Sequence, residues 1–354
     1  MSTATNDIEP RTTLKQRVDL VLGAFVETET GHLLAIDQDL KPVADQLRVA
    51  TAHGKRLRAA FCYWGWRAAG QPDSDALVRA AAAMELVHAA AVVHDDLIDD
   101  SRLRHGLPTA HLAFRGALSG RPHRRGAARS LAMLTGDLLM SWAGQLFTDS
   151  GLPAAYLARA RVLWSVLARE LVAGECLEIL RTGAEPDVQA SLEVIRYKTA
   201  KYTVEHPLHI GAALGGASRE LRERCTAYGL PLGEAFQLRD DLLGVFGDPD
   251  RTGKANTDDI TAARPTVLVA HAWHAATGAE RRDLRRLLGS PRLDADGLER
   301  VRAIMQRTGA PARVEQMVAE RVGTAVDVVR RAPLPRDTAD ALVELAHTAT
   351  VRRS

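Results

Sequence analysis

Cysteine is scarce in this sequence. Its 354 residues include only three cysteines, Cys62, Cys176 and Cys225, which are far apart and odd in number. They form no Cys-x-x-Cys pair, so the sequence gives no sign of a disulfide framework or a cysteine redox pair. We therefore expect small buried thiols in a reducing compartment, with the cytoplasm as the default location.

Long apolar runs are missing as well. Residues 1–14 carry acidic and basic side chains and have no apolar centre, so no signal peptide is visible. The longest apolar stretch, residues 80–93, is interrupted by Glu85 and His88. This stretch is too short to cross a bilayer, and we expect no membrane span.

The sequence also has little net charge and few lysines. It contains 46 Lys+Arg against 44 Asp+Glu, a formal charge of +2, and only six of the basic residues are lysines. This balance argues against a protein that coats nucleic acid, which normally has a strongly basic face. With 46% hydrophobic and 25% charged residues, the composition is typical of a soluble globular protein.

Alternating β-branched runs are nearly absent, and apolar residues recur at helical spacing along most of the chain. The segments with this spacing are 14–28, 77–99, 130–146, 153–180, 188–202, 220–245, 266–276, 293–305, 314–329 and 338–348. There is no Gly/Ser-rich linker and no internal repeat. The sequence therefore predicts one all-α domain over residues 1–354, with a motif-bearing core at about 45–275 and C-terminal helices in 276–354.

A first acidic cluster lies at the C-terminal end of the helix predicted over 77–99. Asp95 and Asp99 are four residues apart and share a face, while Asp96 lies about 100° around the helix. Like charges at this spacing destabilise a helix, so the cluster needs either a cation or full solvation. Carboxylates at this density suit Mg²⁺ shared with substrate phosphates better than zinc. The simpler alternative is a solvated acidic helix end.

A second acidic pair, Asp240-Asp241, closes the apolar helical run over 220–245. Two such pairs on separate helices can face each other across a bundle core and hold metal ions. A buried acidic pair without a cation would be very unfavourable. The occurrence of both clusters therefore favours a metal site over a solvated surface.

Basic residues flank both clusters. The segments concerned are Gly54-Lys55-Arg56-Leu57-Arg58, Arg104, Lys198-Thr199 with Lys201, and Arg251-Thr252-Gly253-Lys254. Acidic groups for Mg²⁺ together with several cations for phosphate describe a diphosphate site.

Together these motifs resemble those of the trans-isoprenyl diphosphate synthases, most closely the bacterial geranylgeranyl diphosphate synthases. Asp95-Asp96-Leu97-Ile98-Asp99 matches the family's first aspartate-rich motif, and residues 104–109 stand where the family has Arg-Arg-Gly-x-Pro-Thr. The further matches are Gly54-Lys55-Arg56-Leu57-Arg58, Tyr197-Lys198-Thr199-Ala200, and Phe236-Gln237 with Asp240-Asp241. The matched blocks follow the family's order within residues 54–269.

The resemblance implies an isoprenoid synthase-type helical bundle around a deep central cavity, usually in a homodimer. It also implies roughly three Mg²⁺ ions per active site, shared with substrate diphosphate. The metal ligands implied are Asp95, Asp96, Asp99, Asp240 and Asp241. The residues implied to bind and stabilise the departing diphosphate are Arg104, Lys198, Thr199, Gln237 and Lys254. The residues implied to bind isopentenyl diphosphate are Lys55, Arg58, His88, His105 and Arg264.

The implied reaction ionises an allylic diphosphate, and the double bond of isopentenyl diphosphate attacks the resulting cation. Loss of a proton then completes the five-carbon extension. This chemistry needs no nucleophilic side chain, so the lack of a Gly-x-Ser-x-Gly or Cys/His signature is expected.

The residues before the first acidic motif line the tail pocket in this family. Ala90 and Ala91 are small, and Met84 lies eleven residues before Asp95, about 16 Å deeper along the helix. We hypothesise that Met84, together with Met133 or Leu134 of a neighbouring helix, forms the pocket floor and favours a C20 product. The alternative is that Met84 is ordinary core filling.

Several positions depart from the family pattern. His105 replaces a second arginine, Gly244 replaces the last aspartate of the second motif, and Arg264 replaces a lysine before Thr266. Glu175 and Glu178 stand where the family prefers Gln and Asp. Of these departures, His105 and Arg264 affect the extender site more than the allylic site.

Other functions stay open at this point. They are a class I terpene cyclase, a prenyltransferase of the same fold with another acceptor, and a non-catalytic partner subunit of a synthase. His88 with His94-Asp95 also suggests an HD-type metal phosphohydrolase, and His206 with His209 suggests a separate metal site. The basic stretch 121–125 is interpreted as a solvated loop.

Overall fold

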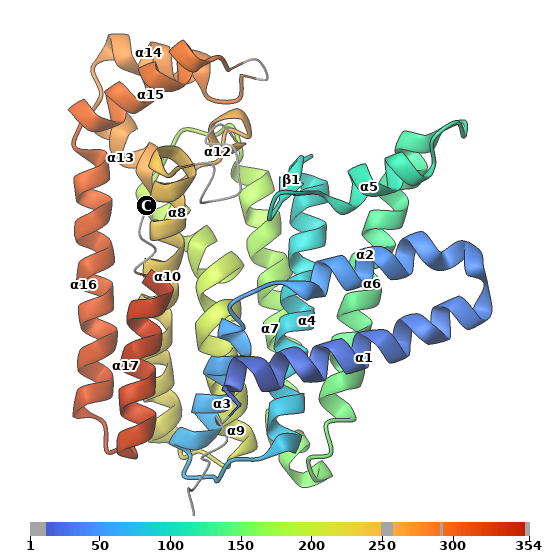
Figure 1. Cartoon of the computed structure of the whole chain (residues 1–354). Coiled ribbons are helices and arrows are strands. Elements are labelled where there is room, and N and C mark those ends of the chain that lie inside the picture. Colours follow the sequence, from blue (N-terminus) through green and yellow to red (C-terminus); the bar gives the residue numbers. More distant parts are fainter. Residues whose placement is uncertain (1–11, 249–257, 291–292, 351–354) are drawn as a thin grey trace, which may run out of the picture.

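The structure is a computed structural model that describes residues 12–248, 258–290 and 293–350. Most of these residues are helical, and two short strands form one antiparallel hairpin (Figure 1). The elements before residue 150 are α1 (Leu14–Ile36), the 3₁₀-helix η1 (Gln38–Leu40), α2 (Lys41–Ala52), α3 (Leu57–Ala68), α4 (Asp75–Ile98), β1 (Leu103–Arg104), β2 (Leu107–Pro108), α5 (Ala110–Ala117) and α6 (Arg124–Thr148). The middle elements are α7 (Ala154–Arg181), α8 (Val188–Val194), the π-helix η2 (Ile195–Glu205), α9 (His206–Leu214) and α10 (Arg219–Phe246). The last elements are α12 (Asp258–Thr261), α13 (Val267–Ala275), α14 (Gly278–Leu287), α15 (Ala295–Arg307), α16 (Ala310–Arg331) and α17 (Arg336–Thr350). The predicted all-α class is confirmed.

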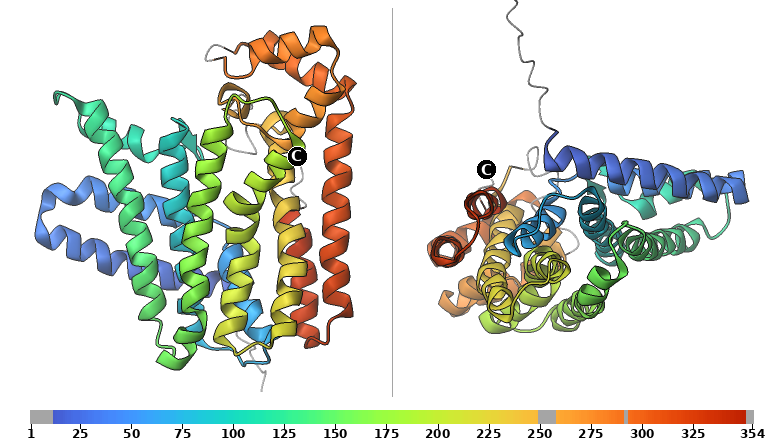
Figure 2. Two further views of the ribbon diagram at one scale, coloured as in Figure 1. Left: turned by 180° about the vertical axis from the view of Figure 1, so that it is seen from behind. Right: turned by 90° about the horizontal axis from the view of Figure 1, so that it is seen from below.

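The long helices α4, α6, α7, α10 and α16 run roughly parallel to one another along the molecule (Figures 1 and 2). The hairpin of α1 and α2 crosses this bundle and packs on α4 and α6. Helices α14 and α15 lie together at one end of the bundle, above α16 in Figure 1. Three large apolar clusters fill the interior, one around α4, one between α10 and α13–α16, and one between α3, α9, α10 and α17.

Helix α4 carries the first acidic cluster and is the central core helix. Its N-terminus is capped by Ser74, whose hydroxyl accepts a hydrogen bond from the backbone N–H of Leu77. By length and composition alone, α4 is the one helix in the described ranges that could cross a membrane, yet 72% of its apolar window is buried inside the protein. Burial in the core explains why the sequence of α4 is apolar and rich in alanine.

The segment predicted as one helix over 188–202 is divided in the structure. Helix α8 continues into the π-helix η2, which carries Lys198, Thr199 and Tyr202. Two glycines allow neighbouring helices to approach η2 closely: a Cβ on Gly174 of α7 would lie 2.2 Å from the Lys198 backbone nitrogen, and one on Gly233 of α10 would lie 2.4 Å from the Ala200 Cα. Such π-turns are frequent at functional sites. This packing fixes η2 between α7 and α10.

Candidate active site

A cavity of about 1190 Å³ lies among the helices that carry the predicted motifs. Its wall is formed by residues of α2, α3, α4, the β1–β2 hairpin, α7, α8, η2 and α10, and by residues of the segment 259–266. Two groups of polar side chains line it, one mainly acidic and one mainly basic.

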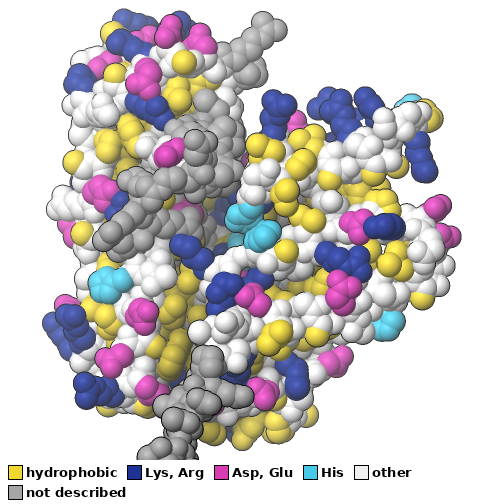
Figure 3. Space-filling model, viewed as in Figure 1, with side chains coloured by type: hydrophobic (Ala, Val, Ile, Leu, Met, Phe, Trp, Pro, Cys, Tyr) yellow, Lys and Arg dark blue, Asp and Glu magenta, His cyan; other side chains and the backbone are white. Residues whose placement is uncertain are grey.

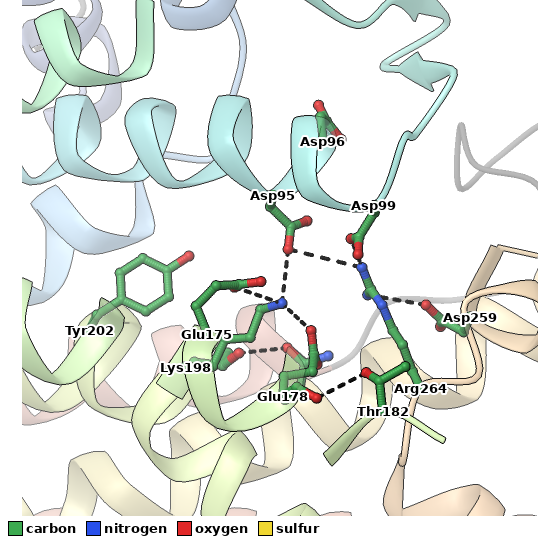
Figure 4. A network of polar contacts seen from close by, with 12 residues as sticks. Asp95, Asp96, Asp99, Glu175, Glu178, Thr182, Lys198, Tyr202, Asp259 and Arg264 are labelled. Atoms are coloured by element: carbon green, nitrogen blue, oxygen red, sulfur yellow. Dashed lines mark hydrogen bonds and ion pairs between the residues drawn. The ribbon is translucent and has the colours of Figure 1, made fainter. Parts of the chain in front are cut away.

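Lys198 lies at the centre of the acidic group (Figure 4). Its Nζ is 2.9 Å from Asp95 Oδ1 and 2.9 Å from Glu175 Oε2, and it also contacts Glu178. Burial lowers the pKa of Lys198, but the facing carboxylates of Asp95 and Glu178 outweigh this effect and raise it above its usual range. The ammonium group is therefore charged and forms ion pairs with carboxylates from two other helices, α4 and α7.

The same carboxylates can hold a divalent metal ion. One oxygen from each of Asp95, Glu175 and Glu178 lies within 4.8 Å of the others, and the described residues contain no other group of this kind. Glu175 Oε1 is buried and has no hydrogen-bond partner in the described part of the chain. A site made only of carboxylate oxygens suits Mg²⁺. The donor set therefore fits the metal that the sequence implies.

Arg264 lies in the acidic group, contrary to the expectation that it belongs to the extender site. Its guanidinium contacts Asp99, and its Nη1 is 3.2 Å from Asp259 Oδ1 (Figure 4). The segment after α12 brings the Arg264 side chain to the end of α4, and its role in substrate binding stays a prediction.

Asp259 is a site residue that the sequence analysis missed. A Cβ on Gly244 would lie 2.3 Å from Asp259 Oδ2, so the carboxylate of Asp259 occupies the space beside the glycine. Gly244 stands where the family has the last aspartate of the second motif. A carboxylate is thus present at this position, but it comes from α12 instead of α10. The signal in the sequence was the Asp258-Asp259 pair.

The second acidic pair lies on α10, and both residues line the cavity. Thr199 Oγ1 donates to Gln237 Oε1 at 2.8 Å, and Gln237 Nε2 donates to Asp241 Oδ1 at 2.8 Å. Burial raises the pKa of Asp241 to about 8, and the charges of Asp259 and Asp240 act in the same direction. A cation beside Asp241 would relieve this penalty. The structure thus brings the predicted residues Thr199, Gln237, Asp240 and Asp241 to one wall of the cavity.

Asp96 is separated from Asp95 and Asp99. It is buried and points away from them in Figure 4, and both of its oxygens accept hydrogen bonds from Arg104, at 3.2 and 2.5 Å. This two-pronged pair holds the β1–β2 hairpin against α4. Its role as a metal ligand stays a prediction, whereas its contact with Arg104 is a feature of the structure.

The basic group is built around Arg58. Its Nη2 donates to Tyr202 Oη at 2.7 Å and to Thr203 Oγ1 at 2.8 Å, and its guanidinium lies 4.4 Å from the centre of the Tyr202 ring. Tyr202 Oη is also 3.3 Å from His88 Nδ1. Because the Tyr202 hydroxyl accepts from Arg58, its own proton is available to His88. Burial, together with the charges of Arg58 and Arg104, lowers the pKa of His88 well below its usual range.

Other predicted residues of the extender site line the same part of the cavity. They are Lys55 and His105; Arg104, predicted to bind the departing diphosphate, lines the cavity too, as does His53, which the sequence analysis did not single out. The rings of His53 and His105 lie 6.0 Å apart, centre to centre. Arg56 also lines the cavity, but its guanidinium is held by a structural contact: its Nε is 2.7 Å from Asp19 Oδ1, and its φ of 56° places it in the left-handed region before α3.

The tail-pocket hypothesis is corrected in part. Ala91 lines the cavity, whereas Ala90 and Met84 are buried in the core around α4. Met133 and Leu134 are 47% and 55% exposed, so they do not form a floor within this chain. The reason is that α6 turns the face with Ala132 and Gly136 toward α4, and Met133 and Leu134 lie outside this contact face.

The sequence also suggested two histidine metal sites, one with His94 and one with His206. His94 Nε2 lies 3.1 Å from the Met133 carbonyl oxygen, and His206 Nε2 lies 2.8 Å from Glu170 Oε2. Neither histidine belongs to a metal-binding group in the described ranges, so the histidine metal centres receive no support. Lys254 lies outside the described residues.

Comparison with known proteins agrees with this geometry. The family model for polyprenyl synthetases matches residues 41–305. The geranylfarnesyl diphosphate synthase of Aeropyrum pernix is 31% identical over 81% of this chain and 86% of its own length. A (2E,6E)-farnesyl diphosphate synthase of Mycobacterium tuberculosis is 30% identical over 95% and 88%.

A solved structure is also similar. It is a geranylgeranyl pyrophosphate synthase from Corynebacterium glutamicum complexed with isoprenyl diphosphate and magnesium, with a TM-score of 0.92, 32% identity and coverage of 98% of this chain and 100% of that chain. The predicted isoprenoid synthase-type bundle is therefore confirmed. The chain belongs to the polyprenyl synthetase family.

Proposed function

We propose that this protein is a Mg²⁺-dependent trans-polyprenyl diphosphate synthase that joins isopentenyl diphosphate to an allylic diphosphate. The observation that carries the proposal is the pairing, in one cavity, of the acidic group around Asp95 and Asp241 with the basic group around Arg58 and Arg104. Two diphosphates must be held at once, and their charge requires both metal-binding carboxylates and cationic side chains. The whole chain would act as one domain in the cytoplasm.

The metal ions, roughly three per site, would be held by carboxylates of the acidic group. These are Asp95, Asp99, Asp240, Asp241 and Asp259, with Glu175 and Glu178 adjoining. When bound, Mg²⁺ neutralises charge that develops on the departing diphosphate. Lys198 donates hydrogen bonds to Asp95 and Glu178, and Arg264 donates to Asp99 and Asp259, so both cations lie among these carboxylates.

The extender diphosphate binds the basic group. Lys55, Arg58, Arg104 and His105 supply cationic or hydrogen-bonding groups, and neutral His88 donates from Nε2 because its Nδ1 faces Tyr202. The allylic C–O bond breaks and inorganic diphosphate leaves. The isopentenyl double bond then forms the new C–C bond, and one proton is lost to restore a double bond.

The product proposed is geranylgeranyl diphosphate. Ala91 is a small residue in the cavity wall, which leaves room for a chain beyond C15, and buried Met84 lies about 10 Å deeper along α4. An Ala91→Phe substitution should shorten the main product by one or more C5 units, measured by chromatography of the dephosphorylated alcohols. An unchanged product would remove this pocket assignment.

The protein is proposed to work as a homodimer. Six large apolar side chains on α6 and α7 are 47% to 79% exposed. They are Met133, Leu134, Val162, Val172, Ile179 and Leu180. Large apolar side chains exposed in this number on two helices are typical of a surface that another protein chain covers. A Val172→Glu, Ile179→Glu variant should sediment as a monomer, whereas Leu20→Glu on α1 should leave the dimer intact.

The function is tested with purified protein, Mg²⁺, isopentenyl diphosphate and the C5, C10 or C15 allylic diphosphate. Chain elongation that EDTA abolishes is the expected result. Absence of elongation with all three starters would refute the proposal. A cyclic hydrocarbon formed from geranylgeranyl diphosphate alone would favour a terpene cyclase, and elongation only with an added subunit would favour a partner role.

A further inference from the structure

The segment from Ser101 to Gly136 contains basic residues but no acidic ones. It contains seven arginines and no aspartate or glutamate, in a chain whose overall charge is only +2. The segment forms β1, β2, α5, the loop after α5 and the first half of α6. In the space-filling view, Lys and Arg side chains gather on the upper right of the molecule, over α5 and the loop that follows it (Figures 1 and 3).

Most of these arginines have no acidic partner among the described residues. Arg104 binds Asp96, and Arg129 binds Asp100. The other five are exposed, and none of them forms an ion pair with any residue of the described ranges. They are Arg102, Arg115, Arg121, Arg124 and Arg125. We name this set, with Leu103 and Leu107, the basic rim.

Two exposed leucines lie in the basic rim next to the cavity. Leu103 is 50% exposed and Leu107 is 43% exposed, on the two strands of the short hairpin. Leu107 also lines the cavity, as do Arg104 and His105 of the same hairpin. Leu107 therefore belongs both to the cavity wall and to the exposed surface of the hairpin, which carries Leu103 as well.

The chemistry of the rim favours one kind of partner. Nucleic-acid surfaces combine basic residues with aromatic side chains for stacking, but the only aromatic residue from Ser101 to Gly136 is Phe114, which is buried. Attraction of small diphosphate substrates would require no exposed leucines. A membrane surface with anionic headgroups uses both features, because arginines near it add roughly fivefold each to binding and apolar side chains enter the interface.

We propose that the basic rim docks the protein on an anionic phospholipid surface, with the cavity mouth toward the bilayer. The inference rests on the proposed function, because the product would be a lipid whose hydrocarbon chain partitions into membranes. Docking in this orientation gives the product an apolar path along Leu107 and Leu103 into the bilayer. The contact is peripheral and electrostatic, and it requires no membrane-spanning helix.

The test is sedimentation of the full-length protein with phosphatidylcholine vesicles that contain 30% phosphatidylglycerol or none. The wild type should bind the anionic vesicles at low salt and be released at 0.5 M NaCl. A variant with Arg121→Gln, Arg124→Gln and Arg125→Gln should bind at least tenfold more weakly. Leu103→Ser should also weaken binding, and it leaves the charge unchanged.

The matched control removes the same charge at the other end of the bundle. Arg219→Gln, Arg331→Gln and Arg336→Gln replace three arginines that are 81% to 96% exposed, on α10, α16 and α17. This variant should bind vesicles like the wild type. Equal loss in both variants, equal binding to neutral vesicles, no vesicle binding by the wild type, or tighter binding to a DNA duplex would each overturn the proposal.

Elongation without vesicles is measured on the same proteins. Both arginine variants should keep the wild-type rate, because none of the six residues belongs to the cavity wall. If the wild type shows no elongation, the proposed function fails, while the vesicle measurement still decides whether the basic rim binds lipid.

Discussion

The Lys198 ammonium lies 2.9 Å from Asp95 Oδ1, and this ion pair joins the π-helix η2 to the end of α4. Glu175 and Glu178 of α7 face the same ammonium. A single lysine thus contacts three carboxylates in the wall of the cavity, where a divalent metal and a diphosphate would also bind.

Replacing Lys198 by Gln should reduce kcat by at least 100-fold, because a preorganised cation that stabilises developing charge contributes about this much. Lys201→Gln is the matched control on the same π-helix. Lys201 pairs with Glu170 and Glu205, at 3.1 and 3.2 Å, and does not line the cavity. Steady-state assays should show near-normal turnover for the control; a comparable loss in both variants would contradict a specific role of Lys198.

Tyr202→Phe should raise the KM for isopentenyl diphosphate about tenfold and change kcat little. The hydroxyl lost is the one between Arg58 and His88, and a hydrogen bond to a charged group contributes about 1.5–3 kcal/mol. Tyr228→Phe removes a buried hydroxyl bound to the Leu342 carbonyl at 2.8 Å, outside the cavity wall. That control should lower the melting temperature and leave the KM unchanged. If Tyr202→Phe raised the KM for the allylic substrate more than the KM for isopentenyl diphosphate, the assignment of Tyr202 to the extender site would be contradicted.

Asp259→Asn should weaken Mg²⁺ binding, because it removes the carboxylate beside Gly244 that stands in for the missing aspartate of the second motif. We expect a 10- to 100-fold rise in the Mg²⁺ concentration for half-maximal activity, in line with losses at metal sites. Titration with Mn²⁺, followed by electron paramagnetic resonance, measures the metal affinity directly and without turnover. Asp137→Asn, at a 59% exposed side chain on α6, is the control and should titrate like the wild type.

The metal-free protein should lose stability as the pH rises toward 8. Burial raises the pKa of Asp241 to about 8 in the folded state, while an aspartate in the unfolded chain titrates near 3.9. The folded protein therefore binds the extra proton between these values, and its free energy of unfolding falls as the pH increases through that range. Asp241→Asn should flatten the profile, measured by thermal unfolding with EDTA. The Asp340→Asn control, at a 75% exposed side chain, should retain the wild-type slope.

Gly174→Ala should destabilise the protein by about 3 kcal/mol or more, because its Cβ would overlap the backbone of Lys198 and force η2 away from α7. Gly144→Ala on α6 meets no atom within 4 Å and should stabilise its helix by about 0.5–1 kcal/mol. Urea unfolding compares the two. Similar unfolding midpoints for both variants would mean that the close approach of η2 and α7 is not needed.

The fold class and the main motifs were open to prediction because they are local. Helical periodicity identified the core helices over 77–99, 153–180 and 220–245, and α10 is continuous even through Pro231. The spacing of Asp95 and Asp99 fixed a shared helix face. Both properties depend on residues a few positions apart, and helix geometry relates such positions in a known way.

Contacts between distant segments were not predictable in the same way. Met133 was assigned to the cavity floor, yet α6 presents its small residues to α4 and leaves Met133 exposed. Arg264 was assigned to the extender site, yet it contacts Asp99 and Asp259. Periodicity shows that a helix has two faces, but packing against other helices decides which face is buried.

By itself, the sequence determined an all-α chain with two acidic clusters, a set of phosphate-binding cations and the motif order of a polyprenyl synthetase. Only the tertiary structure decided that Lys198 compensates Asp95, that Asp259 fills the space beside Gly244, and that Asp96 binds Arg104. The physical reason is that these contacts join helices that lie far apart in the chain. Glycines bring η2 against α7 and α10, and this depends on close packing between such distant segments.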